Sequence, residues 1–454
     1  MKTEPRELPA LFRLAWPMIT TQFFIMGTGF LDTAMAGHYS ARDLAGVALA
    51  GNVLWPLFLM LTGITMALTP ITAQLRGSNN LLAAGARIRQ GLWITVATSI
   101  VLIVALSNCE WVFALADINA DTTRIAVAYL QAVCWGIPPV MAYVALRNTS
   151  EGLGHTVPPM VIAGLVLPVN AFLNYGFING AFGLPELGGV GCGYATAIVF
   201  WLEFLMMLVV IRRPFFRATE AFSRWSWPDA QQIRGILVVG VPIGLTMFLE
   251  MAVFSAVGFL VGRMGDIALA AHSIAGNLNW MTYVIPSTLG AAAGIRVGYF
   301  VGAGELDAAR RSAATAYRFA LVYALVVSVL LVVLRHTLVM AYSSDAEVLA
   351  MAANLLLFIA IYQLVDDTQA VAAGALRGYK DTRVPMLYGL VGYWMIAVPL
   401  GVVLAFGSFG FEALGVYGFW AALTIGLTLV AIAISVRLYR TSRNADRIHR
   451  FAAI

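Results

Sequence analysis

The chain has 454 residues, of which 60% are hydrophobic and only 11% are charged, and its formal net charge is +5. Soluble globular domains carry a charge on about a quarter of their residues, so this composition excludes a soluble globule and indicates a membrane protein with many spans. Its long apolar stretches also exclude a β-barrel, whose strands alternate apolar and polar residues over short segments.

A transmembrane helix needs about 20 apolar residues to cross the hydrocarbon core of a bilayer. Enough such stretches occur to predict an all-α polytopic membrane protein with twelve transmembrane helices in two pseudo-symmetric six-helix lobes. In chain order, the predicted spans are approximately 11–35, 47–73, 89–108, 124–145, 157–178, 188–212, 234–260, 270–294, 313–334, 351–374, 386–406 and 413–437.

The basic residues predict the orientation, because lysine and arginine in short loops are retained on the cytoplasmic side. With both termini in the cytoplasm, 24 of the 28 basic residues lie at cytoplasmic ends, Lys2 and Arg6 among them. This split supports an even number of spans. It also explains the net charge without a nucleic-acid surface.

The two halves of the chain repeat one another. An ungapped shift of 225 residues keeps proline, glycine, asparagine and tryptophan in one register, which chance similarity between apolar helices rarely does. Six spans in each half make both halves enter the membrane in the same direction, as in the parallel-repeat plan of transporters. Matching pairs include Pro17 and Pro242, Asn52 and Asn277, Trp55 and Trp280, and, after one inserted residue, Gly152 and Gly378.

The repeat predicts the domain organisation. We expect an N-terminal six-helix lobe over residues 1–212 and a C-terminal six-helix lobe over residues 234–437. Residues 213–233 form the cytoplasmic linker between them, and residues 438–454 form a cytoplasmic tail.

Five carboxylates, those of Asp32, Glu203, Glu250, Asp366 and Asp367, lie inside the apolar stretches. An ionisable group at bilayer depth costs roughly 2.5–3.5 kcal/mol even on lenient insertion scales, so such acids usually face a wet cavity and handle an ion or a cationic solute. An acid near a helix end can instead reach the interface or pair with a base. We take Asp32, Glu250 and Asp366 as candidate coupling residues and Asp367 and Glu203 as additional candidates.

The second half of the sequence holds the more clearly defined cluster of candidate residues. Tyr362 and Asp366 are four residues apart and share a helix face, and Glu250 lies on the span that opens the same half. Their oxygen atoms suit a small cation or a proton. They form one site only if the seventh and tenth spans pack together.

In the first half, Asp32 could meet Asn170 and Asn174, which also share a helix face. Asparagines within spans are often no more than hydrogen-bond partners between helices, so both interpretations stay open on spacing alone.

At these residues the chain resembles the NorM-type branch of the multidrug and toxic compound extrusion (MATE) family. The resemblance covers essentially the whole chain, and the order and spacing of its motifs within the twelve-span frame are highly specific. The motifs are residues 31–37 (LDTAMAG), 170–175 (NAFLNY), 188–196, Tyr362-Gln363 followed by Asp366, and 374–385 (GALRGYKDTRVP).

The resemblance implies a V-shaped pair of lobes in a bacterial inner membrane that exports amphipathic, mostly cationic drugs in exchange for Na⁺ or H⁺, and so confers antibiotic resistance. It implies no cofactor, and we expect a monomer. Pro17 matches a proline proposed to bend the first span. Some relatives carry aspartate at the position of Asn174. The matching second-lobe cation site consists of Glu250, Asp366 and Tyr362, and the first-lobe polar site of Asp32, Asn170, Asn174 and Thr196.

Several apolar and aromatic side chains could line a drug cavity, because methionine and aromatic rings adapt to flat cations through soft packing and cation–π contacts. Ordinary helix packing explains each of them as well. These weaker candidates are Met26, Phe23, Met247, Phe248, Trp280 and Tyr283.

Other functions lack their signatures in this sequence. It contains neither a GxxxxGK[ST] phosphate loop nor an HExxH motif, and its cysteines and histidines form no metal-ligand pattern, so we expect neither an enzyme nor a resident metal. A membrane enzyme would need a catalytic cluster, and a channel would need a symmetric pore lining. The alternative within the same superfamily is a lipid-linked oligosaccharide flippase, which would want basic residues to hold pyrophosphate.

Overall fold

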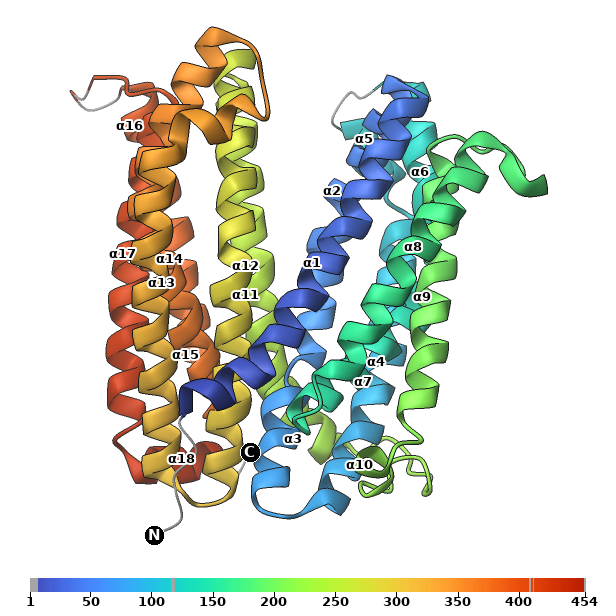
Figure 1. Ribbon diagram of the computed structural model, residues 1–454, viewed down its shortest axis with the longest axis vertical. Helices are drawn as coiled ribbons and strands as arrows, with labels where there is room; N and C mark the ends of the chain where they lie inside the picture. Colours follow the sequence, from blue (N-terminus) through green and yellow to red (C-terminus); the bar gives the residue numbers. More distant parts are fainter. Residues whose placement is uncertain (1–6, 116–118, 408–409, 411, 453–454) are drawn as a thin grey trace. The chain divides into compact units, whose positions relative to one another are not determined.

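The computed structural model describes residues 7–115, 119–407, 410 and 412–452, so Lys2 and Arg6 lie outside the described residues. Over the described ranges the chain forms helices and no strand, which confirms the predicted all-α class (Figure 1). Among the described residues, eleven helices are long and apolar enough to cross a membrane, and a twelfth span results if one bent pair is counted as a single span.

The structure gives the following bounds. In chain order the helices are α1 (Glu7–Tyr39), α2 (Ala41–Thr65), α3 (Leu68–Gly77), α4 (Leu81–Ser107), α5 (Glu110–Leu115), α6 (Ala120–Cys134), α7 (Ile137–Gly152), α8 (Val157–Asn179), η1 (Ala181–Gly183), α9 (Val190–Val210), α10 (Pro214–Arg217), α11 (Ala230–Gly262), α12 (Asp266–Gly302), α13 (Leu306–Met340), α14 (Ala346–Gly378), α15 (Arg383–Gly389), η2 (Leu390–Ala397), α16 (Val398–Phe406), α17 (Val416–Thr441) and α18 (Ala445–Ala452).

Short polar side chains and glycines set many of these helix ends. The side chains of Ser40, Asn80 and Asp345 accept hydrogen bonds from free N–H groups in the first turns of α2, α4 and α14. Gly180 and Gly407 end α8 and α16 with φ angles of 67° and 72°, a left-handed conformation that glycine adopts without strain.

The predicted span over residues 124–145 is the bent pair α6 and α7, whose axes differ by 58°. Pro138 and Pro139, in the first turn of α7, lack the N–H groups that would continue α6. Gly136 lies in the bend against α9, where a Cβ atom would come within 2.8 Å of Ala197 Cα. The bend therefore has a local cause in the sequence.

Contacts between helices divide the chain into two units. One comprises Trp16–Gly244, and the other comprises Leu245–Ile454 together with the start of α1 up to Ala15. These limits differ from the predicted lobe boundaries because the start of α11 packs on α2, where Gly240 and Gly244 lie against the carbonyl oxygens of Ile64 and Met60.

In the first unit, α2 packs against α4 and α6, while α7 and α8 both pack against α9. The segment that follows α9 is held on α4 by polar side chains. The Arg89 guanidinium donates to the carbonyl oxygens of Glu220 and Ala221, and Gln90 Nε2 donates to that of Trp227 at 3.0 Å. This part of the expected linker is therefore fixed to the first unit.

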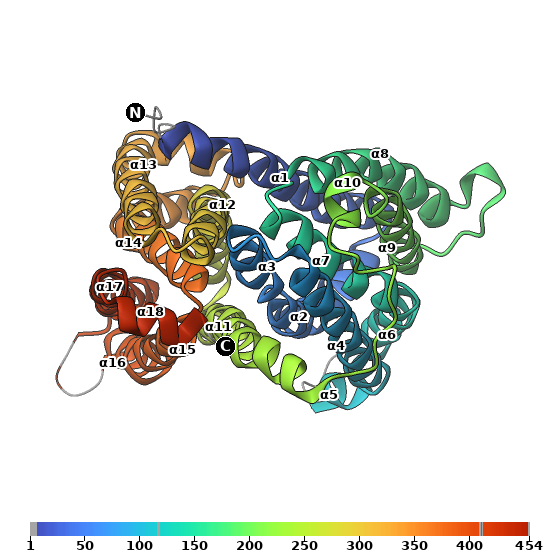
Figure 2. The same ribbon diagram turned by 90° about the horizontal axis from the view of Figure 1, so that it is seen from below.

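In the second unit, α14 packs against α12, α13 and α17 (Figures 1 and 2). Glycines allow its backbone to approach that of α12: Gly374 lies against Gly290, and Gly378 against Gly294. The start of α1 joins this unit through a half-buried ion pair, in which Arg296 Nη2 lies 2.8 Å from Glu7 Oε1.

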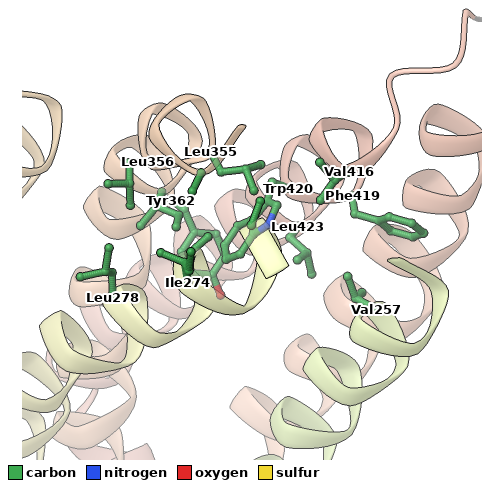
Figure 3. Close-up of a cluster of buried hydrophobic side chains, with 14 of the residues drawn as sticks. Val257, Ile274, Leu278, Leu355, Leu356, Tyr362, Val416, Phe419, Trp420 and Leu423 are labelled. Carbon is green, nitrogen blue, oxygen red and sulfur yellow. The ribbon is translucent and has the colours of Figure 1, made fainter. Parts of the chain in front are cut away.

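A cluster of buried apolar side chains lies between α12, α14 and α17 (Figure 3). Trp420 is fully buried in it, and its ring meets the ring of Tyr362 edge to face with centroids 5.9 Å apart. Leu356 and Ile274 belong to the same cluster. This packing fixes the face of α14 on which Tyr362 lies.

Candidate functional site

The first candidate site lies in the first unit, where α1, α8 and α9 meet. Asp32 on α1 is buried, with 7% of its surface exposed. Asn174 Nδ2 on α8 donates to Asp32 Oδ1 at 2.6 Å, and Thr196 Oγ1 on α9 donates to Asp32 Oδ2 at 3.3 Å. Asn174 Nδ2 also lies 3.1 Å from Asn170 Oδ1. The structure thus brings together all four residues that the family resemblance assigned to the first half.

This site has unused hydrogen-bonding capacity. Asn170 Nδ2 and Asn174 Oδ1 are buried, and neither has a hydrogen-bond partner among the described residues, although buried polar atoms nearly always have one. Carboxylate, amide and hydroxyl oxygens are the ligands that hard cations prefer. A protonated Asp32 could instead donate a hydrogen bond.

Two further residues border this site that the sequence analysis did not single out. Cys192 Sγ lies 3.6 Å from the main-chain oxygen of Asp32, and the buried hydroxyl of Tyr129 faces Thr196. Cys192 belongs to the glycine-rich motif 188–196, which is the signal that could have drawn attention to it. Tyr129 carried no comparable signal.

The second candidate site lies in the second unit, where α11 faces α14. Tyr362 and Asp366 are one turn apart on α14, and only 1% and 5% of their surfaces are exposed. The carboxylates nearest to Asp366 are those of Asp367 and of Glu250, which is half-buried on α11. The carboxylates of Glu250 and Asp366 are therefore close enough for the charge of one to affect the other.

Asp367 lies on a neighbouring face of α14 and has its own hydrogen bonds. Gln363 Nε2 donates to Asp367 Oδ1 at 2.6 Å, and Thr282 Oγ1 on α12 donates to Gln363 Oε1 at 3.1 Å. The other carboxylate oxygen of Asp367 is buried and has no hydrogen-bond partner among the described residues. These hydrogen bonds, from Thr282 through Gln363 to Asp367, link α12 to α14 directly beside Asp366.

Three more residues belong to the second site, and the sequence analysis missed their role. The side chain of Gln369 faces the carboxylate of Glu250, and the guanidinium of Arg377 is the nearest base. Tyr393 lies close to Tyr362 and belongs to η2, a π-helical segment; such segments are rare in proteins, and many of them occur at functional sites. Gln369 and Arg377 follow Asp366 at helical spacing, a signal that was present in the sequence.

The charges at the two sites are mostly negative and are not paired closely. In the part of the chain that the structure describes, no basic nitrogen lies within 4.0 Å of the carboxylate of Asp32, Glu250 or Asp366. The described residues also contain no group of three histidine, cysteine, aspartate or glutamate side chains arranged to hold a metal.

Glu203 lies apart from both sites. It is 8% exposed on α9, and its nearest base is Arg147, whose Nε lies 3.7 Å from Glu151 Oε1. It takes no part in the hydrogen bonds around Asp32.

Pro17 lies inside α1, and the helix continues through it. The Thr21 hydroxyl donates to the carbonyl oxygen of Pro17 at 2.8 Å. The division between the two units falls just before it, between Ala15 and Trp16.

The six candidate drug-contacting side chains are all at least partly exposed. Phe23 and Trp280 are exposed by 45% and 52%, and Trp280 lies beside Tyr283 with ring centroids 6.0 Å apart. The partly buried members are Met26, Met247, Phe248 and Tyr283.

Comparison with known proteins identifies the family of this chain. The MatE family profile matches residues 17–176 and, a second time, residues 242–403. The two matched segments begin at Pro17 and Pro242, the first pair of residues that the internal repeat aligns.

Full-length relatives carry names of one kind. The multidrug resistance protein MdtK of Proteus mirabilis is 38% identical over 98% of this chain and 97% of its own length. The corresponding values are 40%, 98% and 93% for the multidrug resistance protein PmpM of Pseudomonas aeruginosa. The multidrug resistance protein NorM of Aliivibrio fischeri is 38% identical over 98% of this chain and 96% of its own length.

Solved structures share the fold. The eukaryotic MATE transporter AtDTX14 matches with a TM-score of 0.90 at 20% identity, over 99% of this chain and 98% of that one. A multidrug resistance MATE family transporter of the MOP superfamily, solved in an outward-facing conformation, matches with a TM-score of 0.86 at 16% identity, over 98% and 96%. The chain therefore belongs to the MatE family of multidrug and toxic compound extrusion transporters.

Proposed function

We propose that the protein is a cation-coupled multidrug efflux antiporter, which exports amphipathic, mostly cationic drugs in exchange for Na⁺ or H⁺ by alternating access. The names of its full-length relatives support the drug substrates. We propose residues 1–212 and 234–437 as the two repeat units; each contains one of the two segments that match the family profile.

The observation that carries the proposal is the burial of carboxylates without close basic partners. Asp32 and Asp366 are 7% and 5% exposed, and neither has an ion pair among the described residues. A permanently charged and unpaired carboxylate at bilayer depth is costly, so occupation by a cation or a proton stabilises each site. A flippase that binds pyrophosphate would need buried bases where these acids lie.

Competition for the same negative charge explains the exchange. In the outward-open state, Na⁺ or H⁺ neutralises Glu250 and Asp366, or Asp32, and the cationic drug loses the charge that held it. In the inward-open state, the ion dissociates and the site regains its charge. Each ligand then shifts the equilibrium between the two states by its differential affinity for them.

We place the protein in a bacterial inner membrane with both termini in the cytoplasm. The relatives are bacterial proteins, and 24 of the 28 lysines and arginines then lie at cytoplasmic ends. We propose a monomer, because each candidate site is built within a single chain.

Uptake of a fluorescent cation into everted vesicles, with Na⁺ and pH varied separately, tests the proposal. Asp32→Asn, Glu250→Gln and Asp366→Asn remove one charge each, and we expect each to lower ion-driven transport about tenfold or more. Asp121→Asn is the matched control, because Asp121 is 63% exposed and pairs with Arg42 at the surface.

The proposal fails if all three neutral variants transport as well as the wild type under both gradients. Comparison of the two gradients also identifies the coupling ion. A variant that loses only Na⁺-driven uptake identifies a sodium site, whereas one that loses only pH-driven uptake identifies a proton site.

A further inference from the structure

The second unit contains a cavity of about 920 Å³ at the end of the bundle where α12 and α17 finish and α13 begins. It is lined from α13 by Arg310, Arg311 and Arg318, and from α17 by Ser435 and Arg443. None of the residues that line it belongs to either candidate site. In the orientation proposed above, it opens at the cytoplasmic face.

The packing of three helices creates the cavity. Helices α13 and α17 both pack on α14 (Figure 2). The cavity forms a groove between residues of α13 and α17. One hydrogen bond crosses this groove, in which Tyr317 Oη lies 3.0 Å from Ser435 Oγ. The groove is therefore a fixed feature of the folded unit.

The charge of the lining is positive. Four arginines line the cavity, Arg310, Arg311, Arg318 and Arg443, against two glutamates, Glu7 and Glu305. Glu7 is already bound by Arg296, which donates to both of its carboxylate oxygens.

The arginines are also presented in a form suited to an anion. Arg443 is held over the ring of Tyr439, with its Cζ atom 4.0 Å from the centroid. Arg310 Nη2 lies 3.4 Å from Asp307 Oδ1 at the surface. Guanidinium groups bind phosphate oxygens through two parallel hydrogen bonds, so this lining suits a phosphate group.

Exposed apolar side chains continue the same helix faces towards the membrane centre. On α13, Leu321, Val322 and Leu325 follow Arg318 at intervals of three, four and seven residues and are 40%, 58% and 55% exposed. On α17, Ile432 precedes Ser435 by three residues and Tyr439 by seven, so it lies on the same helix face, and it is 57% exposed. An amphiphile can therefore place an anionic head in the cavity and its chains along this strip.

We propose that the groove between α13 and α17 is a binding site for an anionic phospholipid, whose phosphate is held by Arg318 and Arg443 while its acyl chains cover Val322, Leu325 and Ile432. Basic pockets between transmembrane helices on the cytoplasmic side are suited to such headgroups, and the apolar strip favours a lipid over a soluble phosphate. The site stabilises the second unit at the membrane surface, at a distance from the coupling carboxylates.

Native mass spectrometry of the purified full-length protein tests this site, with dioleoylphosphatidylglycerol as the anionic probe and dioleoylphosphatidylcholine as the zwitterionic one. We expect the wild type to retain phosphatidylglycerol selectively. The double variant Arg318→Gln/Arg443→Gln should bind it about tenfold more weakly or worse. The variant Arg318→Lys/Arg443→Lys keeps the charge and should lose less.

Arg335→Gln is the matched control, because it removes one arginine from the other end of α13 and should leave binding unchanged. Inorganic phosphate and glycerol 3-phosphate in excess distinguish a lipid from a soluble anion, and neither should displace the lipid. The proposal is overturned if the glutamine double variant keeps wild-type binding, if phosphatidylcholine binds equally well, or if a soluble phosphate displaces the lipid. Monodisperse elution of each variant establishes that it is folded.

Discussion

Helix α14, which carries the second site, differs at one point from its counterpart in the first unit, the pair α6 and α7. The register that aligns Gly152 with Gly378 places Pro138 and Pro139 on Leu364 and Val365. The first unit breaks there into α6 and α7, whereas α14 continues without interruption. The absence of two prolines therefore keeps Tyr362 and Asp366 on one straight helix face.

The repeat also shows that the chemistry of the two units is not repeated. In the register of Gly152 and Gly378, Asp366 corresponds to Val140 in the first unit, and under the shift of 225 residues Asp32 corresponds to Val257 in the second. Val140 and Val257 are core residues, 3% and 0% exposed. Each acid instead has its own set of partners, so one duplicated scaffold carries two different polar sites.

Backbone packing, in contrast, is repeated closely. Gly152 lies against the backbone of Thr69, and in the same way Gly378 lies against the carbonyl oxygen of Gly294. Thr69 and Gly294 correspond to each other under the shift of 225 residues. The repeat thus preserves the positions where helices touch while the side chains on neighbouring faces diverge.

The most severe test of this comparison is to give α14 the proline of the first unit. Val365→Pro removes a hydrogen bond inside a helix that is packed against three others, at a cost of about 3 kcal/mol or more. We expect drug export to be lost and the thermal unfolding midpoint of the purified protein to fall. Pro139→Val is the control in the first unit, where Gly136 still fits against α9. Wild-type behaviour of Val365→Pro would show that a straight α14 is not required.

The next largest effect on stability is expected in the loop that follows α14. Asp381 is buried, with its Oδ2 atom 2.7 Å from Arg437 Nε and 3.1 Å from Thr441 Oγ1. Asp381→Asn leaves Arg437 without its counter-charge and should lower the free energy of unfolding by about 3 kcal/mol. The double variant Asp381→Leu/Arg437→Met should recover most of that loss in chemical denaturation. A single variant as stable as the wild type would show that the pair contributes nothing.

The repeated backbone contacts predict matched and smaller effects. Gly152→Val and Gly378→Val each introduce a side chain where the facing backbone leaves no room, and each should cost about 1–3 kcal/mol. Gly276→Ala is the control, because no atom of another helix lies within 4 Å of the added Cβ. Thermal unfolding measures all three. Strongly unequal losses for the two valine variants would contradict the equivalence of the two contacts.

The sequence was sufficient for the family and the helical class, because the length of the apolar stretches and the order of the motifs each leave a direct signal. It also named the residues that the structure brings together around Asp32. It did not predict that Gln369 and Arg377 face Glu250, because that depends on where α11 lies relative to α14. Pro138 and Pro139 signal the bend in the sequence. They lie within a continuous apolar stretch, however, which predicts a single span over residues 124–145. The π-helical segment around Tyr393 left no sequence signal.

The smallest expected effect concerns pH and the first unit, where His155 occupies the position of Asp381. Partial burial, with the ring stacked on Phe215 at 3.8 Å, and then the charge of Arg76 lower the pKa of His155 below its usual value of 6.5. The unfolded chain therefore binds a proton more readily than the folded protein, so stability is complete above the usual pKa and is lost as the pH falls below about 6.5. His155→Gln cannot take up this proton, and its thermal midpoint should decline less than that of the wild type between about pH 7.5 and about pH 5. Because every other titrating group is common to both proteins, the difference between the two curves isolates His155, and a difference that stays constant over this range would show that its protonation does not affect folding.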